Sequence, residues 1–187
     1  MIHYSLKILI YFKCALSVKN LYNIAHCFIY LTLFYLMDII FDIDGTLYDH
    51  NHRLRYLFSD PPNWERFKSD IHLDTKIPEI NDLLISLHKD HRIIFCTGRD
   101  RSLEEITTTQ ILKLYENSSI YVDKTKILLY MRAENDMRLD DEVKQDLLKD
   151  MQNDGFDPKV VFEDRKSVVN MWRNNGLICL QVAENDS

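Results

Sequence analysis

Three groups of polar residues each follow a run of apolar residues, and their side chains are of the kinds used in chemistry on phosphate groups. The groups are Asp42 with Asp44, Thr97-Gly98-Arg99, and Glu163-Asp164. Carboxylates from separate segments can hold Mg²⁺, which prefers oxygen ligands and usually keeps some of its waters. A hydroxyl group and backbone amides after a strand can bind phosphate oxygens, and a lysine such as Lys144 can neutralise charge that develops during transfer.

Paired carboxylates can divide the work of such a reaction. One held beside the metal can attack phosphorus and form an acyl phosphate, and a second can then give and take the proton. Asp140 and Lys144 are four residues apart, so on a helix they share a face and the acid can orient the ammonium group. Two other interpretations of Asp42-x-Asp44-Gly45 are a polar turn after a core strand and a calcium loop. The residues after Gly45 are Thr, Leu, Tyr and Asp, which fit an EF-hand poorly because that pattern needs further acids and a late Glu.

The segments between these groups alternate between strand and helix patterns. Strands are predicted over 38–43, 92–97 (ending at Gly98), 127–131, 159–162 and 177–182. Helices are predicted over 78–90, 103–115, 140–151 and 167–175, with a short one after Pro61 and Pro62 that Asp60 could cap. Gly176 would end the last helix. Strands separated by helices indicate right-handed βαβ units, hence a doubly wound, mostly parallel α/β sheet whose strand ends meet at one edge.

Composition limits the class of protein. The length of 187 residues indicates one domain. The net charge of −6 argues against a protein that coats nucleic acid independently of sequence. A small basic pocket that binds one end of a nucleic-acid strand is still compatible with that charge. The four cysteines are scattered without a C-x-x-C pair, which suits a reducing compartment and predicts no zinc site. The four glycines do not form a Walker P-loop or a G-x-G-x-x-G motif.

Residues 1–36 differ from the rest because they contain no Asp or Glu and are rich in Ile, Leu, Tyr and Phe. The apolar run over 27–37 is too short to span a bilayer, which takes about 20 residues. We interpret this segment first as a misassigned start or dispensable extension before Met37, then as a membrane-associated segment, and last as a signal peptide. We therefore expect the functional domain over 37–187 and a cytoplasmic location (host cytoplasm if viral), with membrane contact only if residues 1–36 are native.

The groups above occur in the order of the four motifs of the haloacid dehalogenase superfamily, which the sequence resembles from about Met37 to its end. The motifs are Asp42-Ile43-Asp44-Gly45-Thr46, Thr97, Lys144, and Glu163-Asp164. The resemblance implies Asp42 as nucleophile, Asp44 as general acid/base, and Thr97 and Lys144 as phosphoryl-binding groups. It also implies Mg²⁺ held by Asp42, the Asp44 carbonyl, Glu163 and Asp164, and a small helical cap insertion.

A closer resemblance is to the 3'-phosphatase domain of phage-type polynucleotide kinases. It is carried by His52-Arg53, Trp64-x-x-Phe67, Thr97-Gly98-Arg99, Met131-Arg132, the segment from Asp136 to Lys144, Asp164-Arg165, and the segment from Val168 to Arg173. It implies that Arg53, Gly98, Arg99 and Asp140 serve substrate binding and the phosphatase reaction. This chain departs from the family in carrying Glu163, which is one methylene longer than the usual Asp, and in lacking the kinase half.

We therefore expect a Mg²⁺-dependent phosphomonoesterase that acts on nucleic-acid 3'-phosphate ends through an aspartyl-phosphate. Because the kinase half is missing, a separate kinase or ligase would complete the repair of an end. One alternative is a phosphatase of small nucleotides or sugars. The other is a catalytically weak accessory or binding domain, which Glu163 keeps open. For Trp64 and Phe67, packing is favoured over base stacking.

Overall fold

The computed structural model describes residues 36–185, and five strands in that range form one parallel sheet. The order across the sheet is β5-β4-β1-β6-β7. The strands are β1 (Asp38–Phe41), β4 (Arg92–Asp100), β5 (Leu129–Arg132), β6 (Pro158–Arg165) and β7 (Ile178–Asn185). The predicted doubly wound, parallel α/β fold is confirmed.

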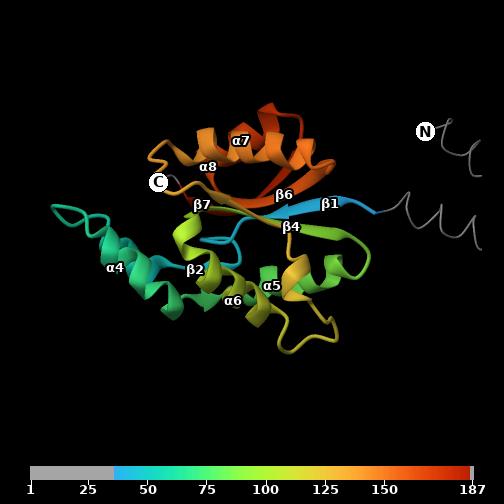
Figure 1. The fold of residues 1–187 in the computed structure, drawn as a ribbon, viewed down its shortest axis with the longest axis horizontal. Helices are drawn as coiled ribbons and strands as arrows, with labels where there is room; N and C mark the ends of the chain where they lie inside the picture. The colour runs from blue at the N-terminus through green and yellow to red at the C-terminus, as the bar shows by residue number, and fades with distance from the viewer. Residues whose placement is uncertain (1–35, 186–187) are drawn as a thin grey trace, which may run out of the picture. The chain divides into compact units, whose positions relative to one another are not determined.

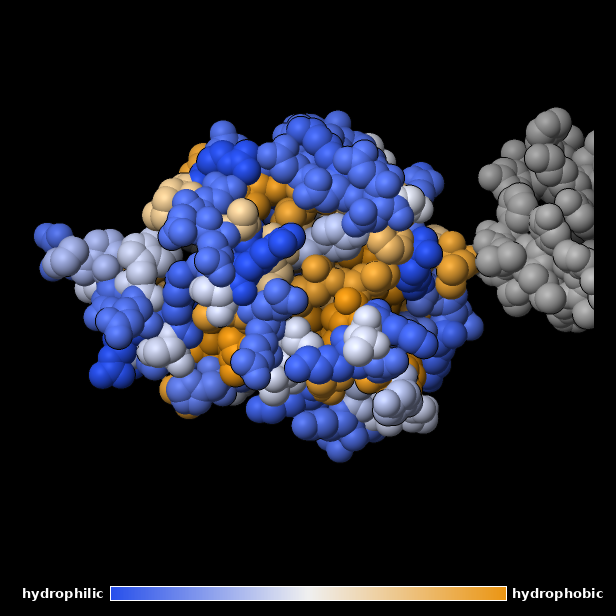
Figure 2. Space-filling view, in the orientation of Figure 1, coloured by the Kyte–Doolittle hydropathy of each residue, from blue (hydrophilic) through white to orange (hydrophobic). Residues whose placement is uncertain are grey.

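Two layers of helices cover the sheet, as Figure 1 shows. The helices are α5 (Pro78–His88), α6 (Glu104–Leu114), α7 (Asp140–Asn153) and α8 (Lys166–Asn174). Ile40 packs in the core under α7 and α8, whereas its neighbours Ile39 and Phe41 pack in the core with residues of α5 and α6. Both faces of β1 are thus buried, which explains why Ile39, Ile40 and Phe41 are all apolar. On the face drawn in Figure 2 most residues are hydrophilic, and apolar residues are visible between the helical layers.

The carboxyl end of β1 lies between those of β4 and β6. Phe41 is in register with Phe95 on one side and Phe162 on the other. The Asp42 backbone N–H donates to the Phe162 carbonyl at 3.0 Å, which fixes the first residue after β1 beside the end of β6. The chain passes from β1 to β4 on one side and later crosses from β5 to β6 on the other side, and open α/β sheets bind ligands at such a switch point.

A helical insertion follows β1 and forms the predicted small cap. It lies between two short antiparallel strands, β2 (Tyr48–Asp49) and β3 (Thr75–Lys76), and contains α3 (Asn51–Leu54), α4 (Trp64–Ser69) and the 3₁₀ helix η1 (Asp70–Leu73). The prediction that Asp60 is the N-cap residue of the short helix was wrong. Helix α4 starts at Trp64, so the residue before it is Asn63, whose side chain accepts the Arg66 backbone N–H at 2.9 Å, and Asp60 is too far upstream.

Strand β4 also differs from its predicted end at Gly98. It continues to Asp100, which pairs with Arg132 of β5 after an irregularity in register. Gly176 follows α8 with a φ of +82°, as predicted for the residue that ends that helix. No helix within residues 36–185 is long and apolar enough to cross a membrane. The predictions for the N-terminal extension concern residues 1–35, which lie outside the described range, and Leu36.

Candidate active site

Three buried carboxylates meet at the carboxyl ends of β1 and β6. Asp42, Glu163 and Asp164 each offer an oxygen within 4.8 Å of the others. The Asp42 Oδ2 atom is buried and has no hydrogen-bond partner among the described residues. Gly45 makes room for this cluster, since a Cβ atom there would lie 2.1 Å from the Asp164 Oδ2 atom. An all-oxygen set with an unsatisfied buried acceptor fits a divalent cation such as Mg²⁺.

Lys144 of α7 joins two of these carboxylates. Its buried ammonium group donates to Asp42 Oδ1 at 2.6 Å and to Glu163 Oε2 at 2.7 Å. Burial opposes the charge, but Asp42 and Glu163 raise the pKa of Lys144 well above its usual value, so it stays protonated. Glu163 is held further by the indole N–H of Trp172 at 3.4 Å and the Arg165 backbone N–H at 3.3 Å. Glu163 therefore contacts the core through Trp172 and also belongs to the cluster of three carboxylates.

The acidic cluster is strained electrostatically when no cation is bound. Burial and the charge of Glu163 raise the pKa of Asp42 to about 7, against the lowering effect of Lys144. Burial also raises the pKa of Glu163. Because metal ligands must be deprotonated, cation binding here would release a proton near neutral pH.

Asp44 belongs to a second cluster, although it is only two residues from Asp42. Its Oδ1 accepts from Arg53 at 2.6 Å and from Arg99 at 2.5 Å, and its Oδ2 accepts from the Arg99 Nε at 2.9 Å. Burial disfavours its charge, but Arg99 and Arg53 hold the pKa of Asp44 well below its usual range. The chain turns directly after Asp44, through Gly45 at a φ of +87°, a conformation that favours glycine.

Asp74, which sequence analysis missed, anchors both arginines. Its fully buried carboxylate accepts from the Arg53 Nε at 2.8 Å, from an Arg53 terminal nitrogen at 3.0 Å, and from Arg99 at 3.1 Å. The imidazole of His52 lies 2.9 Å from the same carboxylate. Arg99 is fixed on its other side by the Gln110 Oε1 at 2.5 Å. No motif marks Asp74, which lies alone between η1 and β3.

The turn after Thr97 is closely packed. The Thr97 hydroxyl oxygen accepts the Arg99 backbone N–H at 3.2 Å, and the Gly98 carbonyl accepts from Arg132 at 2.8 Å. A Cβ atom on Gly98 would lie 2.7 Å from an Asp140 carboxylate oxygen. The glycine is therefore needed for the close approach of Asp140 to the turn.

Asp140 makes different contacts from those expected. Its carboxylate accepts from Arg132 and Arg165, whereas Lys144 reaches past it to Asp42 and Glu163. That Asp140 orients the Lys144 ammonium group stays a prediction: the charge of Asp140 acts on Lys144, while the direct hydrogen bonds of the lysine go to Asp42 and Glu163. Arg165 of β6 thus pairs with a carboxylate of α7. The assigned roles of Asp140 in substrate binding and of the Asp44 carbonyl in metal binding stay predictions.

Comparison with known proteins identifies the family of the chain. Residues 37–187 match the sequence model of the phosphatase domain of polynucleotide kinase, PNKP. Two solved structures of a Pnkp1/Rnl/Hen1 complex, one described as an RNA repair complex, contain chains that are 28% and 29% identical, with TM-scores of 0.64 and 0.63. Both matches cover 81% of this chain but only 44% and 47% of theirs, so the chain spans less than half the length of these relatives.

More distant structures share the fold. A haloacid dehalogenase-like hydrolase from Streptococcus pneumoniae is 17% identical with a TM-score of 0.51, over 79% of this chain and 85% of its own. The class C acid phosphatase from Bacillus anthracis is 14% identical with the same TM-score, over 74% and 58%. The parallel α/β fold and the family match lead to one assignment: the chain is a haloacid dehalogenase-like phosphatase that belongs to the family of polynucleotide kinase phosphatase domains.

Proposed function

We propose that this protein removes the phosphate from nucleic-acid 3' ends, with Mg²⁺ as cofactor and Asp42 as nucleophile. The observation that carries the proposal is that the two carboxylate oxygens of Asp42 have different surroundings. Lys144 holds one of its oxygens at 2.6 Å, while the other is buried and has no partner among the described residues. One oxygen is thus oriented, and the carboxylate keeps a lone pair for phosphorus or for a cation.

Asp42, Glu163 and Asp164 would hold the Mg²⁺, which when bound supplies positive charge to the transferring phosphoryl group. Lys144 contributes a second positive charge next to the nucleophile. Attack by Asp42 on phosphorus would break the ester bond to the 3' oxygen and leave an acyl phosphate on Asp42. Water would then hydrolyse this intermediate and release inorganic phosphate.

Asp44 would handle the protons of both steps. Paired with Arg53 and Arg99 it is ionised, which is the state that accepts a proton from the attacking water. To donate a proton to the leaving 3' oxygen, Asp44 must first be protonated, which requires weaker hydrogen bonds from Arg53 and Arg99 to its carboxylate. A substrate phosphate that competes for the two guanidinium groups would provide it, since Arg binds phosphate oxygens in bidentate fashion.

The choice of a nucleic-acid end rests on the family and on the relative found in an RNA repair complex. We propose that a kinase or ligase acts on the same broken strand. The cap is small, with only two short helices and one 3₁₀ turn between β2 and β3. A small cap leaves space for a polymer end.

The experiment is phosphate release by residues 37–187 with and without Mg²⁺. The substrates are a 3'-phosphorylated oligonucleotide, a 3'-mononucleotide and an aryl phosphate. We expect release that needs Mg²⁺ and is fastest, by kcat/KM, on the oligonucleotide. Asp42→Asn should abolish release, whereas the exposed Asp82→Asn, a matched change on α5, should leave it unchanged.

Release from the small esters alone would replace the polymer substrate by a small-molecule one. Trapping of ³²P on the wild-type protein after acid quenching, and its absence in Asp42→Asn, tests the aspartyl-phosphate separately. No Asp42-dependent release from any substrate would favour the accessory-domain alternative.

A further inference from the structure

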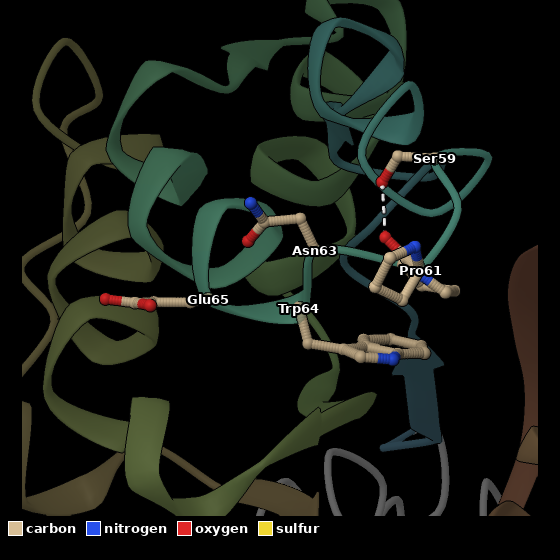
Figure 3. A pocket seen from close by; sticks show the side chains of 6 residues that line it. Ser59, Pro61, Asn63, Trp64 and Glu65 are labelled. Carbon is tan, nitrogen blue, oxygen red and sulfur yellow. Dashed lines mark hydrogen bonds between the residues drawn. The ribbon is translucent and has the colours of Figure 1, made fainter.

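A half-exposed tryptophan lies at the first turn of the cap helix α4. Trp64 is 51% exposed and lines an open hollow on the cap together with Ser59, Pro61 and Pro62. Figure 3 shows its indole beside Pro61, whereas the side chain of Glu65 points away from it. The hollow therefore has one flat aromatic wall. Glu65 also lines the hollow, but its carboxylate is directed away from the indole.

A chain of ring and charge contacts connects this indole to the candidate active site. The rings of Trp64 and Phe67 meet edge to face, with centroids 5.9 Å apart. The guanidinium group of Arg53 lies over the Phe67 ring at 4.4 Å, and the same group donates to Asp44 at 2.6 Å. Trp64 is thus the outermost member of a contiguous series that ends at the catalytic carboxylates.

Ordinary packing explains Phe67 but not Trp64. Phe67 is partly buried beneath Arg53, as the sequence analysis favoured for both aromatic residues. The chain's other tryptophan, Trp172, shows what a core residue looks like, since it is fully buried and its N–H donates to Glu163. The indole of Trp64 instead presents half of its surface to solvent at the border of the site.

We propose that Trp64 stacks against a nucleobase of a single-stranded 3' end whose terminal phosphate occupies the site at Asp42. This inference rests on the proposed function and names the contact that would distinguish a polymer end from a small ester. An exposed aromatic side chain can stack on any base, because every base has a π face. With a net charge of −6 the chain cannot rely on a basic surface for affinity, so local stacking supplies what electrostatics does not.

The kinetic test compares Trp64→Ala and Trp64→Phe with the wild type on 3'-phosphorylated DNA and RNA oligonucleotides and on an aryl phosphate. Loss of one stacked base corresponds to about a 5- to 150-fold weakening. We expect Trp64→Ala to raise KM for the oligonucleotides by that factor and to leave kcat/KM for the aryl phosphate unchanged. Trp64→Phe should restore most of the difference, and Tyr121→Ala, an exposed aromatic residue outside the cap, should have no effect.

A binding test uses the fact that the chain has only two tryptophans, one of which is buried. An oligonucleotide with a 3'-hydroxyl end, which cannot be hydrolysed, should quench the fluorescence of the wild type but not that of Trp64→Phe. Replacing the last two nucleosides with abasic units should remove the quenching.

The outcomes separate this proposal from the proposed function. Equal losses on the oligonucleotides and the aryl phosphate in Trp64→Ala would show a structural role and overturn stacking while the phosphatase activity stands. Oligonucleotide quenching that persists without Trp64 or without bases would also overturn it. Failure of the proposed function would appear differently, as no Asp42-dependent release from any substrate.

Discussion

Asp44 and Asp74 share the same two arginine side chains. Arg53 and Arg99 each donate to the Asp44 carboxylate and each donate to the Asp74 carboxylate. The four side chains form a group with no net charge, and Asp44 is the member that lies two residues from Asp42 in the chain. A substrate phosphate can therefore displace Asp44 from the arginines while Asp74 still holds them in position.

Asp74→Asn is expected to disorder both arginines. The change removes the buried counter-charge of Arg53 and Arg99, and breaking a buried ion pair costs about 3–5 kcal/mol of folding free energy. We expect a lower free energy of unfolding in urea and a kcat for an aryl phosphate reduced by at least about tenfold, since the phosphate clamp is no longer aligned. KM should change less than kcat, because the arginines keep their positive charge.

Asp82→Asn on the exposed face of α5 is the matched control and should behave as the wild type. Asp74→Glu should recover part of the activity if the carboxylate positions the arginines. An Asp74→Asn protein with wild-type kcat at a temperature where it is folded would contradict the positioning role.

Gly45→Ala tests the close approach of Asp164 to the first turn. Gly45 and Gly155 have φ angles of +87° and +88°, so alanine strains the backbone equally at both, by about 1 kcal/mol. A Cβ atom at Gly45 would lie 2.1 Å from Asp164, whereas no described atom outside the neighbouring residues lies within 4 Å of a Cβ atom at Gly155. Gly45→Ala should thus lose Mg²⁺-dependent activity by 100-fold or more (on the order of 3 kcal/mol of barrier).

Gly155→Ala should lose only stability, seen as a drop in Tm of about 3 °C. Mg²⁺ titration followed by Tm separates the two effects, since only Gly45→Ala should fail to gain stability from the cation. Equal activity losses in both variants would mean that backbone strain, and not displacement of Asp164, limits the enzyme.

The carboxyl-edge residues could be predicted because each comes directly after a buried apolar run: Asp42 follows β1, and Thr97 and Glu163 lie in the last part of β4 and β6. The apolar runs before Asp42, Thr97 and Glu163 identify central strands, and parallel strands place their following residues at one edge. Local pattern was sufficient there because position in the chain determines position in the sheet. The short strands β2 and β3 could not be found in this way, since two residues each show no periodicity.

Asp74 and Asp140 show where such inference ends. Asp74 meets Arg53 and Arg99 across 21 and 25 residues of chain, so its role depends on how the cap closes onto β4. For Asp140, spacing along the helix correctly predicted a shared face with Lys144. It could not predict that Arg132 and Arg165, which come from two other strands, would take the carboxylate.

Stabilisation by Mg²⁺ should increase with pH. The pKa of Asp42 is about 7 in the folded, metal-free protein and 3.8 for an ordinary aspartate, so between these values the folded state holds a proton that the unfolded state has lost. The contribution of Asp42 to stability therefore falls as pH rises through this window. Mg²⁺ must displace the proton below pH 7, so the Tm gain at saturating Mg²⁺ should be larger at pH 8 than at pH 6. Asp42→Asn should show no such pH dependence, and a larger gain at pH 6 in the wild type would contradict the assignment.

Glu163→Gln should make the acidic cluster easier to ionise but poorer at binding a cation. The variant can keep an oxygen acceptor for Lys144 and Trp172 but loses the charge that raises the pKa of Asp42. The pH midpoint of Mg²⁺ stabilisation should therefore move below that of the wild type, while the Mg²⁺ concentration for half-maximal activity rises by about tenfold, or 1.4 kcal/mol. Glu163→Asp is the conservative comparison: it keeps the charge but withdraws from Trp172, so its activity should not exceed that of the wild type. A large gain of activity in Glu163→Asp would show instead that Glu163 weakens an enzyme built for a shorter acid.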